Sequence, residues 1–175
     1  MIDFSRNHFE LFGLPARYRV DPDALDAAYR SLQSEVHPDR FARGSDAERR
    51  LALQASARVN EAYRMLKDPV QRAQYLLGLN GVDAAGETDT QLPIEFLERQ
   101  LERREAAGEA LAAGDERTLS SLREAVRGEA RQIEDHLAQA LDNGADYAAA
   151  RPRVRELTFL SKLAADIGAM SSSLD

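Results

Sequence analysis

The chain has no cysteine, no tryptophan and few aromatic residues, which make up 6% of its 175 positions. Without thiolates it cannot form disulfides, and it cannot hold zinc or an iron–sulfur cluster through its own cysteines. No run approaches the about 20 apolar residues that a membrane-spanning helix needs. The N-terminal stretch MIDFSRNHFELFGLP has the features of neither a secretory signal nor a transit peptide. We therefore expect a cytoplasmic protein with no membrane partner.

An excess of positive charge is also lacking, since the formal net charge is −7. Residues 1–77 carry 12 Lys or Arg against 11 Asp or Glu, and residues 78–175 carry 11 against 19, so the two parts have net charges of +1 and −8. This balance disfavours a nucleic-acid partner, because neutralising phosphates needs clustered cations. The asymmetry suggests two structural units.

What the chain does contain is typical of an all-α protein, with 43% hydrophobic and 30% charged residues, many helix formers and few β-branched runs. Apolar residues recur at helical spacing in seven segments, and caps or prolines mark most of their ends. The expected helices are 7–12, 22–36, 45–67, 69–77, 93–113, 115–142 and 146–167.

Residues 78–92 include three glycines and no helical stripe, so we expect a linker there between two domains. The first domain, 1–77, contains a helical hairpin with short flanking helices. The second, 93–175, has three long helices with short turns, which predicts an antiparallel three-helix bundle. Pro152 predicts a kink or a late start of the last helix, Gly128 costs about 1 kcal/mol of helix stability unless a neighbour packs against it, and the tail 171–175 is expected to fray.

The stretch EVHPDRF at 35–41 stands between the two long helices of the first domain. In one interpretation His37-Pro38-Asp39 only ends a helix, with Asp39 hydrogen-bonding its own loop. In the other, the loop lies at the tip of the hairpin, where Pro38 fixes its shape and Asp39 binds an arginine of a partner. Nearby arginines give this end a positive character that favours an acidic partner surface. They are Arg30, Arg40, Arg43, Arg49 and Arg50.

Groups that converge on a catalytic or metal site are not apparent. The three histidines, His8, His37 and His136, are scattered and lack the spacings of metal ligands. The glycines of 78–92 neither follow a strand nor open a helix, so they do not predict a phosphate cradle. We expect no enzyme activity, no metal and no cofactor.

With HPD at 37–39 between two amphipathic helices, the chain resembles the J-domain family, the partners of DnaK-type chaperones. Within that family it is most similar to the iron–sulfur co-chaperones of the HscB type. Five segments carry this similarity and span nearly the whole chain. They are LFGLPARY at 11–18, HPDRF at 37–41, NEAYRMLKDPVQRAQYLL at 60–77, FLERQLERRE at 96–105 and RELTFLSKL at 155–163.

The resemblance implies an adaptor between two proteins. The J-domain would dock on an HscA-type ATPase through His37, Pro38 and Asp39, with Arg30, Arg40 and Arg43 nearby, and would stimulate its ATP hydrolysis. The C-terminal bundle would hold an IscU-type iron–sulfur scaffold, so that scaffold and chaperone meet at a raised effective concentration. The residues that match the scaffold-binding positions of the family are Leu97, Leu101, Glu102, Glu105 and Phe159.

The scaffold surface has an alternative interpretation, because two leucines one helical turn apart, and Phe159, are often core residues. The chain also departs from the family pattern. Glu98 stands where an apolar residue is frequent, and Arg30 is the only base of helix 22–36, so docking would depend more on the loop, Arg40 and Arg43. Two other functions stay open: a J-domain co-chaperone for a different client, and a helical adaptor whose HPD is an inert turn. Since no long apolar seam is present, we expect a monomer.

Overall fold

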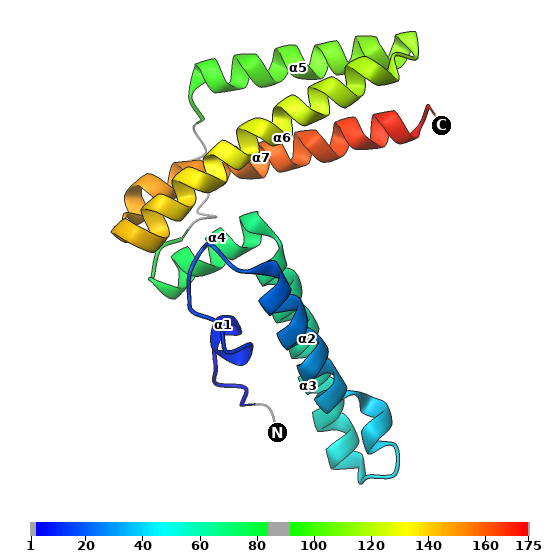
Figure 1. Ribbon diagram of the computed structural model, residues 1–175, viewed down its shortest axis with the longest axis vertical. Coiled ribbons are helices and arrows are strands. Elements are labelled where there is room, and N and C mark those ends of the chain that lie inside the picture. Colours follow the sequence, from blue (N-terminus) through cyan, green and yellow to red (C-terminus); the bar gives the residue numbers. More distant parts are fainter. Residues whose placement is uncertain (1–2, 84–91, 175) are drawn as a thin grey trace. The chain divides into compact units, whose positions relative to one another are not determined.

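The computed structural model describes residues 3–83 and 92–174 and divides the chain into two compact units, Met1–Leu79 and Asn80–Asp175 (Figure 1). The prediction of an all-α fold is confirmed, because the described residues form helices and turns and no strand. The predicted linker 78–92 is two residues shorter at its start, since α4 continues through Gly78 to Leu79. Residues 84–91 of that linker lie outside the described residues.

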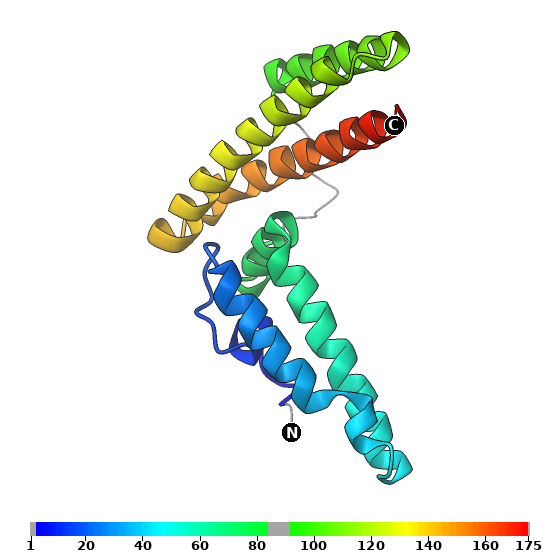
Figure 2. The same ribbon diagram turned by 45° about the vertical axis from the view of Figure 1, so that its right-hand side comes forward.

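The first unit is a helical hairpin flanked by two shorter helices. Its elements are α1 His8–Leu11, α2 Pro22–Val36, the 3-10 turn η1 Pro38–Phe41, α3 Asp46–Lys67 and α4 Pro69–Leu79. Helices α2 and α3 run antiparallel side by side, as Figures 1 and 2 show, and η1 joins them at one end of the hairpin. Their buried faces contribute Leu25, Val36, Val59, Ala62 and Leu66.

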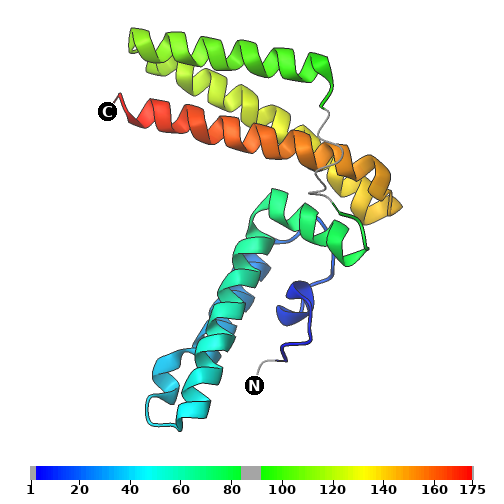
Figure 3. The ribbon, with the colours of Figure 1, turned by 180° about the vertical axis from the view of Figure 1, so that it is seen from behind.

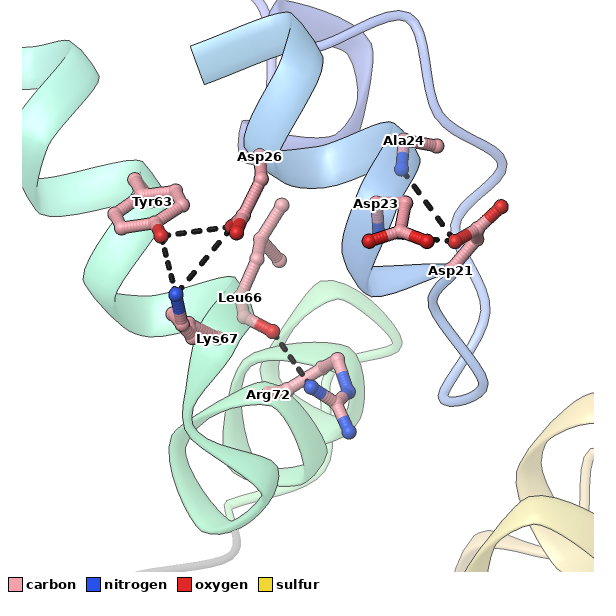
Figure 4. A network of polar contacts seen from close by, with 8 residues as sticks. All are labelled: Asp21, Asp23, Ala24, Asp26, Tyr63, Leu66, Lys67 and Arg72. Carbon is pink, nitrogen blue, oxygen red and sulfur yellow. Dashed lines mark hydrogen bonds and ion pairs between the residues drawn. The ribbon is translucent and has the colours of Figure 1, made fainter. Parts of the chain in front are cut away.

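Local chemistry sets where these helices begin. The carboxylate of Asp21 accepts hydrogen bonds from the backbone N–H groups of Asp23, at 3.0 Å, and Ala24, at 3.4 Å (Figure 4). Pro22 at the first helical position needs no partner for the N–H it lacks. Ser45 and Glu48 form a reciprocal capping box at the start of α3. The predicted starts of both helices are therefore confirmed.

Polar side chains cross-link the hairpin toward the end opposite η1. The rings of Tyr29 and Tyr63 stack at a centroid distance of 4.0 Å. The Tyr63 hydroxyl donates to Asp26 at 2.8 Å, and Lys67 contacts both groups (Figure 4). The Tyr63 hydrogen bond, and then Lys67, lower the pKa of the Asp26 carboxyl. Specific polar pairs thus hold the relative position of two helices whose apolar faces alone would allow sliding.

Helix α4 closes the first unit against α1 and the turn at Tyr18. The Arg72 guanidinium donates to the carbonyl of Leu66 at 2.6 Å (Figure 4). It also lies over the Tyr18 ring, 4.9 Å from its centroid. His8, only 3% exposed, stacks on Tyr75 at 4.3 Å, and the Tyr75 hydroxyl accepts a hydrogen bond from the His8 backbone at 3.0 Å. Burial, and then the charge of Arg58, lower the pKa of His8, so its ring is held neutral in this packing.

The second unit contains three long helices, α5 Ile94–Ala113, α6 Glu116–Ala138 and α7 Tyr147–Ser172 (Figure 3). Gly114 ends α5 in the left-handed conformation, with φ of 67°, and the Asp115 carboxylate caps α6 by accepting from the Thr118 N–H at 3.1 Å. Helices α6 and α7 form the main packing pair, and α5 covers part of it. The core of this unit is apolar, with Leu119, Val126, Leu137, Leu157 and Leu160 fully buried.

Three boundaries in this unit differ from the prediction. The helix expected over 115–142 ends at Ala138 and continues as a π-helical turn, η2 Gln139–Gly144. Of the two outcomes predicted for Pro152, a late helix start is wrong, because Asp146 caps the Ala149 N–H at 3.0 Å and starts α7 ahead of the proline. Helix α7 continues past the expected end at 167 to Ser172, so the tail beyond it is shorter than predicted. In its last turn the Ser172 hydroxyl donates to the Gly168 carbonyl at 3.0 Å.

Candidate functional site

The HPD loop is built by the abrupt end of α2. His37 has an extended ψ of 127°, which Pro38 favours in the residue before it, and Pro38 then opens η1. The backbone N–H of Asp39 donates to Nδ1 of His37 at 3.3 Å, which makes Nδ1 an acceptor and leaves Nε2 as the nitrogen facing outward. The loop therefore has a defined shape that needs no partner.

The Asp39 carboxylate points into solvent, with its side chain 91% exposed and that of His37 54% exposed. His37 Nδ1 lies 3.6 Å from its Oδ2. Within residues 3–83 and 92–174 no side-chain hydrogen bond ends on this carboxylate, so the interpretation in which Asp39 bonds its own loop is wrong. An exposed, pre-positioned carboxylate is suited to a bidentate bond with a partner arginine.

The predicted arginines around the loop have different environments. Arg40 donates from Nη1 to the carbonyl of Ser34 at 3.1 Å, which places a cation at the C-terminus of α2, where the helix dipole favours it. Arg49 is engaged by Asp46 and by the Ala42 carbonyl. Arg30 and Arg43 are exposed; Arg30 lies two turns before His37, about 10 Å along α2.

A hollow of about 400 Å³ lies beside the loop and is lined mainly by apolar side chains. Phe41, at the end of η1, lines it together with Leu32 and Val36 of α2 and Leu51 of α3. Phe41 is not among the predicted site residues, although its place directly after HPDR was a signal that its ring anchors the loop on the hairpin. The loop thus combines a polar tip with an apolar base.

A second candidate surface lies on α5. Leu97 is 41% exposed and Leu101 is 58% exposed, so neither is a core residue. Ile94, 66% exposed, continues the stripe one turn earlier and is not among the predicted residues. Glu102 and Glu105 are exposed beside it, as is Glu98.

Phe159 comes to this surface from α7, about 60 positions later in the sequence. Its ring packs edge-on against Phe96 of α5 at a centroid distance of 5.8 Å and is only half-buried. The buried Phe96 therefore links the apolar stripe of α5 to the exposed part of Phe159. Of the five predicted scaffold residues, all are at least partly accessible.

Ion pairs fix the rotation of α5 about its axis and so keep its leucines outward. Arg99 and Arg103 both bind Glu129 of α6, Arg99 at 3.3 Å, and Arg104 binds Asp166 of α7 at 3.2 Å. Burial alone would raise the pKa of Glu129, but Arg103 and then Arg99 outweigh it and lower this pKa. The inner face of α5 carries the buried Phe96, Gln100, Ala107 and Ala110, so turning the apolar stripe inward would expose these residues and break the ion pairs.

In the described part of the chain no three His, Asp or Glu side chains are placed to hold a metal ion. Among the helices within residues 3–83 and 92–174, none is both long enough and apolar enough to cross a membrane.

Family models cover both units. Residues 7–75 match the DnaJ domain, and residues 92–168 match the HSCB C-terminal oligomerisation domain. The co-chaperone protein HscB homolog of Azoarcus sp. (strain BH72) is 49% identical over 166 residues, which cover 95% of this chain and 94% of that protein. The HscB homolog of Ralstonia nicotianae is 49% identical over 171 residues, covering 98% and 97% of the two chains.

Solved structures give the same answer for the fold. The chaperone HscB from Vibrio cholerae superimposes with a TM-score of 0.85 at 34% identity, covering 97% of this chain and all of the other. Human co-chaperone protein HscB gives a TM-score of 0.87 at 28% identity, covering 96% and 83%. The two domain matches occur in the order that the HPD loop and the α5 surface predict, and the relatives align over nearly their full length. The chain therefore belongs to the HscB family of J-domain co-chaperones.

Proposed function

We propose that the protein stimulates ATP hydrolysis by a DnaK-family chaperone of the HscA type and delivers to it an IscU-type iron–sulfur scaffold, in support of cluster maturation. The observation that carries the proposal is the Asp39 carboxylate, which is 91% exposed in a loop of fixed shape. Family membership supports the type of partner, since J-domains act on DnaK-type chaperones.

The chaperone contact is centred on the loop. Asp39 supplies a charge-assisted acceptor, Pro38 limits the entropy lost on docking, and His37 presents Nε2. Arg30 and Arg43 are exposed and available to an acidic surface. Arg40 acts by holding the loop on α2 through the Ser34 carbonyl, so its removal disturbs docking indirectly.

The scaffold contact is the surface formed by Leu97, Leu101 and Phe159, with Glu102 and Glu105 as an acidic rim. Burying a leucine side chain contributes about 1.5–3 kcal/mol, so two half-exposed leucines can supply the centre of a specific interface. The glutamates favour a basic rim on the scaffold and set its orientation. Ile94 extends the apolar area toward the start of α5.

The experiment is the ATPase rate of the matching HscA-type chaperone with this protein and the scaffold present. Asp39→Asn keeps the size of the side chain and removes its charge, and we expect stimulation to be lost while the thermal melt is unchanged. Asp23→Asn, an exposed carboxylate in the first turn of α2, is the matched control and should stimulate normally. Full stimulation by Asp39→Asn would refute the proposal.

A co-chaperone for a different client is the second candidate, favoured by Glu98, which is exposed between the leucines where an apolar residue is common in the family. Affinity capture from cell extract separates the two, because the first requires that a cluster scaffold be retained. An inert helical adaptor would show no effect on the ATPase at all.

We also propose that the protein is a monomer in the cytoplasm and performs no catalysis itself. The absence of cysteine is compatible with a reducing compartment. The description of the matched C-terminal domain includes oligomerisation, which makes the monomer a point to test by light scattering after size-exclusion chromatography. A stable dimer over the working concentration range would overturn it.

A further inference from the structure

A groove of about 410 Å³ lies between α6 and α7 and is lined by three arginines and small side chains. Arg123, Arg127 and Arg131 follow each other at four-residue spacing along one face of α6, and α7 forms the other wall. That wall consists of Leu160, Ser161, Ala164 and Ala165.

The groove lies on the side of the α6–α7 pair that faces away from α5. Glu129, which binds the arginines of α5, is two residues from Arg127, so the two side chains point in nearly opposite directions on a helix of 3.6 residues per turn. The same holds in α7 for Asp166, which binds Arg104, and the groove residue Ala164. The groove is therefore separate from the surface proposed for the scaffold.

Two of the three guanidinium groups form no close ion pair within residues 3–83 and 92–174, although Arg131, and then the charge of Arg127, lower the pKa of Glu124, and Glu134 lines the same groove. Arg131 is paired with Glu124 at 2.6 Å. Arg123 and Arg127 form no ion pair with any described residue, and Nε of Arg123 is buried without a hydrogen-bond partner. Like charges one turn apart repel each other, so this arrangement is relieved when an anion binds.

The backbone is shaped to seat Arg123. A Cβ placed on Gly168 of α7 would lie 2.9 Å from both Cζ and Nη2 of Arg123, so a side chain at this position would require the guanidinium to shift. The buried glycine thus leaves room for the guanidinium against the helix backbone, at a site inside a helix where glycine is otherwise less favourable than alanine. The group is held in place rather than free on the surface.

We propose that this groove binds a short acidic segment of a protein partner, with Arg123 and Arg127 each gripping a carboxylate. Planar guanidinium groups bind carboxylates through two parallel hydrogen bonds, and the small side chains of the α7 wall let a peptide approach. A long polyanion such as nucleic acid is disfavoured, because binding it requires many clustered cations and the groove has only three arginines along a single helix. This inference does not depend on the proposed chaperone or scaffold contacts.

The test uses the full-length ¹⁵N-labelled protein and a blocked tetrapeptide, Glu-Ala-Ala-Glu, titrated in NMR at low salt. We expect saturable shifts at the amides of the groove, including Ala164 and Ala165, and no such shifts with Gln-Ala-Ala-Gln. Arg127→Gln should weaken binding about tenfold, and Arg127→Lys, which keeps the charge and loses the fork, should weaken it less. Arg117→Gln, the same change on α6 outside the groove, should leave it unaltered.

Three results would overturn the proposal. Equal weakening by Arg117→Gln and Arg127→Gln would show a general charge effect. Equal binding of the glutamine peptide would remove the role of carboxylates. Tighter saturation of the same amides by inorganic phosphate or by a single-stranded oligothymidylate would assign the groove to phosphate instead.

Discussion

The two proposed contact surfaces are built in opposite ways. In the first unit the HPD loop is a polar tip a few residues long, shaped by a proline, a helix end and a hydrogen bond between neighbouring residues. In the second unit the α5 surface is an apolar stripe on a regular helix, completed by Phe159 from α7. A contact made by local backbone geometry can be read from a short motif, whereas one made by helix rotation depends on distant partners.

Removing both leucines of α5 tests this contrast with the largest expected effect. Leu97→Ala with Leu101→Ala should weaken scaffold binding about 100-fold, or about 2.7 kcal/mol, measured by calorimetry, since the interface loses its apolar centre. The melting temperature should change little, because both side chains are solvent-exposed in the free protein. Leu119→Ala, at a fully buried position in α6, is the matched control and should cost about 2–5 kcal/mol of stability. Similar unfolding by both variants would mean that the exposed stripe is part of the core.

Weakening the polar cross-link of the hairpin should have a smaller effect, on the stability of the first unit. Tyr63→Phe keeps the stacking on Tyr29 and removes the hydroxyl that bonds Asp26. We expect a loss of about 1 kcal/mol in the free energy of unfolding, measured with urea. Tyr147→Phe, in the first turn of α7, should be nearly neutral. A fully stable Tyr63→Phe variant would show that apolar packing alone holds the hairpin in register.

A gain of similar size is expected in the second unit. Gly128 lies inside α6, and the only atom that an added Cβ would meet is the flexible Nη2 of Arg131, at 3.8 Å. Gly128→Ala should therefore stabilise the unit by about 1 kcal/mol and raise its melting temperature by a few degrees. Gly114→Ala is the contrasting control, since φ of 67° there makes alanine unfavourable.

The smallest expected effect is a pH dependence in the stability of the first unit. Burial lowers the pKa of His8 in the folded state, so the unfolded chain binds more protons than the folded one near and below the ordinary value of about 6.5. The contribution of His8 is complete above that value and is lost as the pH falls below it. The protection factors of α1 and α4 amides against hydrogen exchange should thus fall as the pH is lowered from about 7.5 to about 5.5.

His8→Phe keeps a ring against Tyr75 but has no group that titrates. The protection factors of its α1 and α4 amides should therefore stay constant over this pH range. His37→Gln, at the exposed loop, should retain the wild-type dependence. The carboxyl groups with lowered pKa, such as Asp26 and Glu48, act only at more acidic pH and do not confuse this window. An unchanged slope in His8→Phe would contradict the role of the buried ring.

Much of the fold follows from local sequence signals. Asp21-Pro22 and Ser45 with Glu48 predict the starts of α2 and α3 because their side chains satisfy backbone N–H groups within four residues. Gly114 predicts the end of α5 for a similarly local reason. The start of α7 was harder to predict, because the proline at 152 suggests a break while the capping bond of Asp146 sets the start.

The site divides in the same way. The position of His37-Pro38-Asp39 at the hairpin tip could be predicted, since it needs only two helices and the residues between them. The exposure of Leu97 and Leu101 could not, because leucines at this spacing suit a core as well as a surface. Phe41 was not predicted, although its place directly after HPDR was a local signal. The exposure of Ile94 and the arginine groove of α6 and α7 were not predicted because they depend on how the helices pack.

By itself, the sequence determined the helical class, most helix ends and the HPD turn, because these depend on interactions within a few residues. The tertiary structure alone decided which side of α5 faces solvent, through the ion pairs of Arg99, Arg103 and Arg104 with α6 and α7. It also decided that the Asp39 carboxylate is exposed to solvent and that the Arg123 guanidinium packs against Gly168. Burial is a property of several packed elements together, and no single segment encodes it.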